Sequence, residues 1–136
     1  MRPVLIDTNA YADFMRGRDD IVEIVRNAQR LYLNSIVMGE LLAGFAAGNQ
    51  EARNRAGLTR FLDSPRVTVV PITGSTADRY ALCYIALRRA GTPIPTNDLW
   101  IAASALEHGA DVLTRDAHFA TIPGLRAGHR LDQLLP

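Results

Sequence analysis

Val4-Leu5-Ile6-Asp7, close to the start of the chain, joins an apolar run directly to an acid. A short, continuous apolar run is typical of a strand that is buried on both faces, as in a parallel sheet covered by helices. We therefore predict a buried strand over residues 2–6. Asp7 follows its carboxyl end, the place where α/β sheets bind ligands. Asp7 is thus the first candidate site residue.

The rest of the chain alternates strand-like runs with helical segments. Further strands are predicted over residues 31–33, 67–70 and 111–114, with a short last strand near Leu125-Arg126. Helices are predicted over residues 8–15, 19–27, 36–46, 50–62, 73–91 and 97–108, with Ser35 as the N-cap of the third. Strands separated by helices imply right-handed crossovers. We predict an α/β fold, a three-layer α/β/α sandwich with a mostly parallel central sheet of four to five strands.

Length and composition indicate one packed domain covering residues 1–136. The chain is 48% hydrophobic and 21% charged, which is typical of a globular core. Its apolar stretches are all shorter than a membrane span requires, and the N-terminus is charged too early for a signal peptide. The only cysteine, Cys83, lies in an apolar helical stretch and is predicted to be a buried, inert thiol. A cytoplasmic protein is expected.

The charged residues exclude several classes of enzyme. The net charge is +1, and every Lys+Arg position is an arginine. P-loop kinases, Schiff-base enzymes and pyridoxal-phosphate enzymes all need a lysine. A charge so close to neutral also argues against a large non-specific nucleic-acid surface, although it allows a local basic rim around a site.

Three further acids share the isolation of Asp7. Glu40 and Asp98 are each the only charged residue in a long stretch, and Asp116 follows the predicted strand 111–114. Glu40 lies in the helix after the second strand, and Asp98 begins a helix. All four acids therefore map to one edge of the sheet.

Each acid also has a simpler explanation when it is taken alone. Asp7 and Asp98 stand where a helix N-terminus favours an acid. Glu40 suits an exposed helix side or a buried pair with a distant arginine. Asp116 suits a turn or a pair with Arg115.

Taken together, the four acids favour a divalent cation. Two carboxylates about 4 Å apart repel by about 4 kcal/mol at an effective dielectric of 20. Oxygen ligands select hard ions, so Mg²⁺ or Mn²⁺ is expected rather than Zn²⁺, for which no Cys/His spacing is present. Such an ion at a strand-end cleft commonly serves phosphoryl transfer. Without a lysine or a glycine-rich loop, hydrolysis of a phosphodiester is favoured over nucleotide chemistry.

Four motifs in order carry a resemblance to a known family. They are Leu5-Ile6-Asp7-Thr8-Asn9, Met38-Gly39-Glu40-Leu41, Asn97-Asp98-Leu99-Trp100-Ile101-Ala102-Ala103 and Leu113-Thr114-Arg115-Asp116-Ala117-His118-Phe119. In order, spacing and length the chain resembles a PIN-domain ribonuclease, specifically the toxin of a VapBC-type toxin–antitoxin module. The resemblance covers essentially the whole chain.

The resemblance implies an activity, a cofactor and partners. The activity is endonucleolytic cleavage of RNA that depends on Mg²⁺ or Mn²⁺, with Asp7, Glu40, Asp98 and Asp116 as catalytic and metal-binding acids. Such toxins are usually homodimers. They are neutralised in heterotetramers or larger complexes by a cognate VapB-like antitoxin, whose tail covers the acidic site.

The resemblance also assigns supporting roles and shows one departure. Thr8, Asn9, Asn97 and Thr114 would orient ligands or waters. Many relatives carry a further acid where this chain has His118, which makes one metal ion the firmer expectation and leaves a second open. His118 and Arg115 are candidate substrate contacts. His118 could also shuttle a proton, and a surface histidine is its simpler explanation.

Three other classes of protein fit the sequence less well. A receiver-type phosphoacceptor domain shares the parallel sheet and the strand-end acids, but it uses a lysine that this chain lacks. A haloacid-dehalogenase-type phosphatase needs an acid at Asn9. A non-catalytic binding module with a degenerate site would not be expected to retain all four acids.

Overall fold

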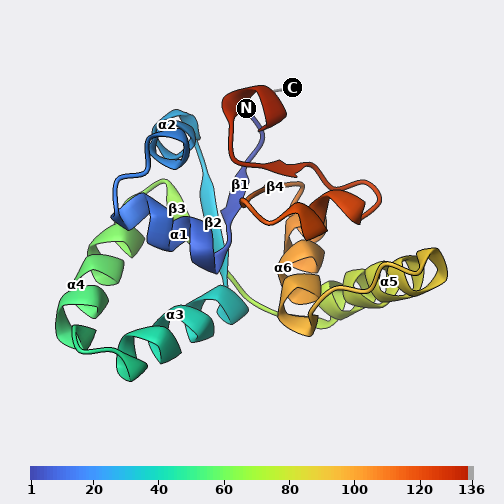
Figure 1. The fold of residues 1–136 in the computed structure, drawn as a ribbon, viewed down its shortest axis with the longest axis horizontal. Helices are drawn as coiled ribbons and strands as arrows, with labels where there is room; N and C mark the ends of the chain where they lie inside the picture. Colours follow the sequence, from blue (N-terminus) through green and yellow to red (C-terminus); the bar gives the residue numbers. More distant parts are fainter. Residues whose placement is uncertain (135–136) are drawn as a thin grey trace.

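A parallel sheet of five strands forms the centre of the computed structural model, which describes residues 1–134 (Figure 1). The spatial order is β3-β2-β1-β4-β5, and every neighbouring pair is parallel. The predicted single domain also includes residues 135–136, which lie outside the described part. The strands are β1 (Val4–Ile6), β2 (Leu31–Asn34), β3 (Val67–Val70), β4 (Asp111–Leu113) and β5 (Ala127–Gly128).

Helices cover both faces of this sheet, and the predicted α/β/α sandwich is confirmed (Figure 1). The helices α1 to α4 lie on one side and α5 and α6 on the other, as right-handed crossovers require. The helices are α1 (Thr8–Met15), α2 (Asp19–Asn27), α3 (Ser35–Ala47), α4 (Glu51–Leu62), α5 (Gly74–Ala90), α6 (Thr96–Glu107) and α7 (Leu131–Leu134), with a 3₁₀ helix η1 (Ala117–Thr121).

The order of the strands changes direction beside β1. From β1 the chain moves outward to β2 and β3, and then crosses to β4 on the other side of β1. The three residues of β1 are fully buried, as the opening apolar run predicts. A crevice between strands whose connections leave in opposite directions is where α/β sheets bind ligands. Asp7 follows β1 at this point, and the turn that carries Asp116 follows β4.

Asn34, the last residue of β2, links the helices α3 and α6 by hydrogen bonds. Its Oδ1 accepts the Val37 N–H at 2.9 Å and so caps α3. Its Nδ2 donates to the Ser104 hydroxyl of α6 at 3.0 Å. The predicted cap at Ser35 is therefore wrong by one residue, because the extended end of the strand already supplies the capping side chain. Asn34 is fully buried, so both bonds are shielded from water.

Replacing Asn34 with alanine is expected to lower the free energy of unfolding by about 2–3 kcal/mol, from a lost cap and a buried hydroxyl left without its partner. Urea unfolding followed by circular dichroism measures this loss. Ser35→Ala is the matched control, since Ser35 is exposed and makes no cap bond, and it is expected to change stability by less than about 0.5 kcal/mol. Equal losses in the two variants would contradict the assignment of the cap.

Other element boundaries agree closely with the sequence pattern, with a few differences. Gly91 ends α5 with a φ of 72°, the left-handed conformation expected of a glycine after a helix. The last strand lies at Ala127–Gly128, two residues beyond its predicted place, and η1 and α7 were not predicted. Short elements of two to five residues carry too little periodicity to be read from sequence.

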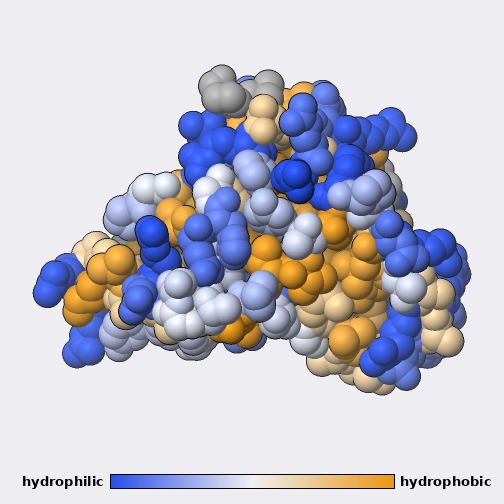
Figure 2. Space-filling model, turned by 180° about the vertical axis from the view of Figure 1, so that it is seen from behind, coloured by the Kyte–Doolittle hydropathy of each residue, from blue (hydrophilic) through white to orange (hydrophobic). Residues whose placement is uncertain are grey.

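The surface retains some exposed apolar side chains. Figure 2 views the molecule from behind, and the arm formed by α5 carries hydrophobic residues between hydrophilic ones. Leu82, Tyr84 and Ile85 of this helix are exposed. Among residues 1–134, no helix has both the length and the apolar character needed to cross a membrane.

Candidate metal centre

All four predicted acids line one cleft at the carboxyl edge of the sheet. The cleft has a volume of about 150 Å³ and lies where β1, α3, α6 and the turn after β4 meet. It is lined by Asp7, Thr8, Asn9, Glu40, Asp98, Ile101 and Asp116. The fold therefore brings together acids that are up to 109 residues apart in sequence.

Asp7 lies deepest of the four. It is 5% exposed, and its Oδ1 accepts the Ala10 N–H at 2.8 Å, so it does cap α1. Burial raises the pKa of the Asp7 carboxyl to about 6, and the charges of Asp98 and Asp116 push it the same way against hydrogen bonds from Thr114 and Ala10. Capping therefore explains only one oxygen, and the site disfavours a bare negative charge at this position.

Glu40 is half-buried on α3, and polar neutral groups hold its carboxylate. Oε1 accepts the Thr8 hydroxyl at 2.6 Å, and Oε2 accepts the Asn97 amide at 3.3 Å. Its partners are thus a hydroxyl and an amide rather than a distant arginine. Each oxygen keeps a further lone pair for another ligand.

Asp98 and Asp116 face each other across the cleft, with His118 beside them. One ligand atom from each of these three side chains lies within 4.8 Å of the other two. Burial raises the pKa of Asp98, and the charges of Asp116 and Glu40 raise it further, whereas His118 lowers it. Asp7 and Glu40 line the same cleft but lie outside this tighter group.

His118 lies closer to the acids than the sequence suggested. It comes from η1, its N–H donates to Asp116 Oδ1 at 2.9 Å, and its Nδ1 lies 3.1 Å from the same oxygen. The side chain is 62% exposed, so it remains open to a substrate as well. The sequence favoured a surface histidine over a phosphate contact or a proton shuttle, since spacing alone does not show how a 3₁₀ turn aims a side chain.

The donor set fits a hard divalent cation. Four carboxylates converge, and burial, reinforced by the neighbouring negative charges, raises the pKa of two of them, Asp7 and Asp98. A cation would relieve this repulsion, and carboxylate oxygens are the ligands that Mg²⁺ and Mn²⁺ prefer.

The remaining predicted residues surround the acids. Thr114 is buried, and its Oγ1 accepts the Asp116 N–H at 2.9 Å, which fixes the start of the turn. Asn9 is exposed at the mouth of the cleft. Thr8 and Asn97 both bond Glu40.

Arg115 has an unexpected partner. Its Nε lies 2.8 Å from Asp13 Oδ2, and its Nη2 lies 3.2 Å from Oδ1. A second cavity of about 310 Å³ lies beside these two residues and shares Asp7 and Asp116 with the acidic cleft. Asp13, buried on α1, was missed at the level of sequence. The signal was there, because Asp13 is an acid among apolar helical positions, as Glu40 is.

Residues 4–125 match the PIN domain. The chain belongs to the PIN domain family. This PIN domain is 34% identical over 90 residues to ribonuclease VapC4 of Mycobacterium tuberculosis, covering 65% of this chain and 68% of the relative. It is 33% identical over 127 residues to ribonuclease VapC11 of the same organism, covering 88% and 90%.

Solved structures share the fold of this PIN domain. DNA-bound VapBC from Salmonella typhimurium superposes with a TM-score of 0.80 at 28% sequence identity, covering 93% of this chain and 97% of that chain. The predicted resemblance to the PIN-domain toxins of VapBC modules is confirmed.

Proposed function

We propose that this PIN domain is the endoribonuclease toxin of a VapBC-type module and that it cleaves RNA with Mg²⁺ or Mn²⁺ bound among its acids. The convergence of Asp7, Glu40, Asp98 and Asp116 on one cleft carries the proposal. Relatives named ribonucleases and a relative solved as a VapBC complex support it.

Asp98 and Asp116 would hold the cation, with Asp7 and Glu40 completing its surroundings. When bound, such an ion lowers the pKa of a water molecule and stabilises the charge that develops on the phosphoryl group in the transition state. The chain's own residues prepare this site. Thr8 and Asn97 fix the plane of the Glu40 carboxylate, and Thr114 holds the backbone of Asp116.

The charge of the Asp7 carboxyl depends on pH. With a pKa of about 6, its carboxyl is largely ionised at neutral pH and protonated in mild acid. Its Oδ1 remains bonded to the Ala10 N–H, which sets the orientation of the group. Activity is therefore expected to fall as the pH drops below about 6.

The proposal includes substrate contacts and partners. His118 is 62% exposed beside Asp116 and is the proposed RNA contact, as predicted. Arg115 is less available for that role, because Asp13 occupies two of its N–H donors. We also propose a homodimer, neutralisation by a VapB-like antitoxin, and action in the cytoplasm.

An assay on cellular RNA tests the proposal. Purified chain is expected to give discrete RNA fragments with Mg²⁺ or Mn²⁺ and none with excess chelator. Sequencing of the new 5′ ends identifies the cleaved RNA. If all RNA stays intact with either ion, at protein concentrations well above those of the RNA, the proposal fails.

The alternatives to a ribonuclease have no support in the names of the relatives given above, which describe two ribonucleases and a VapBC complex. A receiver-type domain would also need the missing lysine. Incubation with acetyl phosphate and Mg²⁺ should accordingly leave the mass of the chain unchanged.

A further inference from the structure

A two-pronged ion pair joins α1 to the turn after β4. Arg115 Nε and Nη2 donate to the two carboxylate oxygens of Asp13 at 2.8 and 3.2 Å. The Asp13 side chain is only 8% exposed. Paired hydrogen bonds between a guanidinium and a carboxylate fix the relative orientation of both groups, which a single bond or a lysine does not do.

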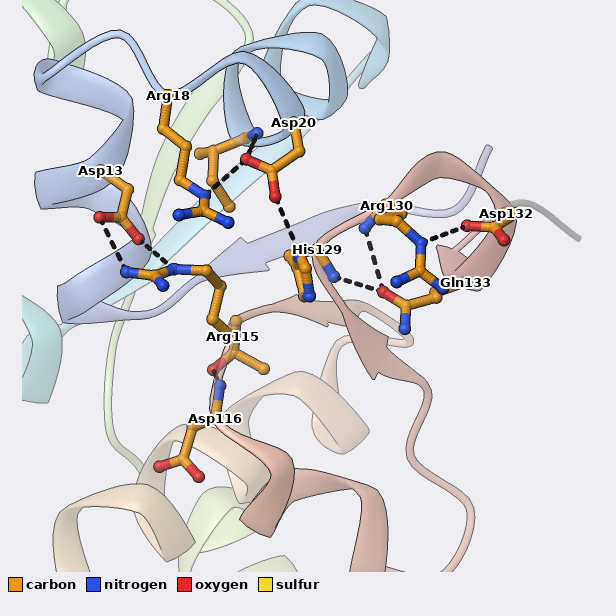
Figure 3. A network of polar contacts seen from close by, with 11 residues as sticks. Asp13, Arg18, Asp20, Arg115, Asp116, His129, Arg130, Asp132 and Gln133 are labelled. Carbon is orange, nitrogen blue, oxygen red and sulfur yellow. Dashed lines mark hydrogen bonds and ion pairs between the residues drawn. The ribbon is translucent and has the colours of Figure 1, made fainter.

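Arg115 stands between two residues of the acidic cleft. Thr114 precedes it and accepts the Asp116 N–H, and Asp116 follows it and lines the cleft. Figure 3 shows the Arg115 side chain reaching up to Asp13, while the Asp116 carboxylate points away from it. The two neighbouring side chains of this turn therefore point in opposite directions. The ion pair therefore anchors the turn without engaging the Asp116 carboxylate, whose contacts are with His118 of the same turn.

The same helix carries Asp7 at its other end. Asp7 caps the start of α1, and its own N–H donates to the Leu113 carbonyl at the end of β4 at 3.2 Å. The turn after β4 is thus tied to α1 twice, through Leu113 at the start of the helix and through Asp13 near its end. Both ties connect the turn that carries Asp116 to the helix that Asp7 caps.

We infer that Arg115 and Asp13 are positioning residues that hold Asp116 at its place beside Asp7 and Asp98. This inference rests on the proposed metal site, and it replaces the predicted substrate contact at Arg115. Arg16 adds little to the pair, since its side chain is 74% exposed and its Nη1 lies 3.4 Å from Asp13 Oδ1.

Simple electrostatics and positioning predict opposite effects of removing Arg115. The charged groups around its guanidinium are Asp13, Arg16, Asp20, Asp7 and Asp116. Loss of a positive charge near a cation site should tighten cation binding if charge alone matters. Loss of an anchor should weaken binding, because the ligands are no longer held at the required distances.

The experiment compares Arg115→Met with Arg2→Met in the purified full chain. Arg2 is a close match, since both side chains are 44% exposed and each pairs with a buried acid, Asp111 in the case of Arg2. Asp111 pairs with Val4 at the amino end of β1 and β4, the edge opposite to the acidic cleft. A purely structural arginine would lower thermal stability in both variants alike.

Two readouts separate the roles. Titration with Mn²⁺, followed by the electron paramagnetic resonance signal of the free ion, is expected to show binding about tenfold weaker in Arg115→Met and unchanged in Arg2→Met. Arg115→Lys keeps the charge but not the paired hydrogen bonds to Asp13, so its affinity for Mn²⁺ is expected to lie between those of the wild type and Arg115→Met. Without metal, the Asp116 and His118 amides are expected to exchange hydrogen about tenfold faster in Arg115→Met, because both belong to the anchored turn.

The outcomes are distinct. Mn²⁺ binding in Arg115→Met that equals or exceeds the wild-type affinity overturns the inference. If the wild-type chain itself binds no Mn²⁺, the proposed function falls, and amide exchange alone then decides the inference. In that case equal exchange in Arg115→Met and the wild type overturns it, and faster exchange confined to the turn supports it.

Discussion

Asp98→Asn is expected to reduce RNA cleavage by about a thousandfold or more while the fold survives. Asp98 and Asp116 offer ligand atoms within 4.8 Å of each other, so Asp98 is central to any ion held in the cleft. Asparagine keeps the shape of the side chain and removes its charge. Preorganised charge and metal ions contribute several kcal/mol to such reactions, which corresponds to this loss of rate.

The loss of activity should not come from unfolding. Burial and the neighbouring acids raise the pKa of Asp98, so ionised Asp98 opposes folding of the metal-free chain. Asp98→Asn should therefore unfold at the same temperature as the wild type or at a higher one. Asp78→Asn, at an exposed position on α5, is the matched control and should retain full activity. If the Asp98→Asn variant cleaves RNA as fast as the Asp78→Asn variant, Asp98 takes no part in the reaction and the proposed acidic site is wrong.

The strand-end acids could be placed from the sequence because their signal is local. Asp7 interrupts the buried pattern of β1, and Asp116 follows β4, so a parallel sheet brings them to one edge. Glu40 and Asp98 stand out as lone charges on apolar helices. Each of these positions departs from burial rules within a few residues of sequence, and such departures concentrate at functional sites.

The contacts between these segments could not be read in the same way. The Asp13–Arg115 pair joins residues 102 apart, and the Asn34–Ser104 bond joins residues 70 apart. Arg115 has an adjacent acid in sequence, Asp116, yet its side chain bonds Asp13 instead. Which of several partners a long side chain selects depends on packing in three dimensions, and neither periodicity nor spacing contains this information.

Asp7→Asn is expected to stabilise the metal-free chain at neutral pH while abolishing cleavage. The folded pKa of Asp7 is about 6, against an ordinary value of 3.8 for an aspartate, so ionising the group in the folded state costs about 3 kcal/mol. Asparagine avoids this cost and remains a good N-cap for the bond to Ala10. A gain of about 2 kcal/mol in the free energy of unfolding is expected at pH 7.5.

The pH dependence identifies the cause. Below about pH 4, Asp7 is protonated in both states and imposes no penalty. Between about pH 4 and 6, the unfolded chain releases the proton while the folded chain keeps it, so wild-type stability falls relative to Asp7→Asn. Above pH 6 the difference should be constant. Urea unfolding with chelator at several pH values measures it, and Asp78→Asn, an exposed acid, should show no such trend.

Adding Mn²⁺ should reverse the ranking of the two proteins. An ion that binds only the folded chain stabilises it by mass action, by about 2.7 kcal/mol at one hundred times the dissociation constant. The wild type would gain this stabilisation at pH 7.5, and Asp7→Asn, with one ligand fewer, would gain little. A variant less stable than the wild type in chelator would show that Asp7 serves the fold first, through its cap. A variant more stable than the wild type in chelator, and less stable than the wild type in Mn²⁺, would show that Asp7 serves to bind the ion and destabilises the metal-free fold.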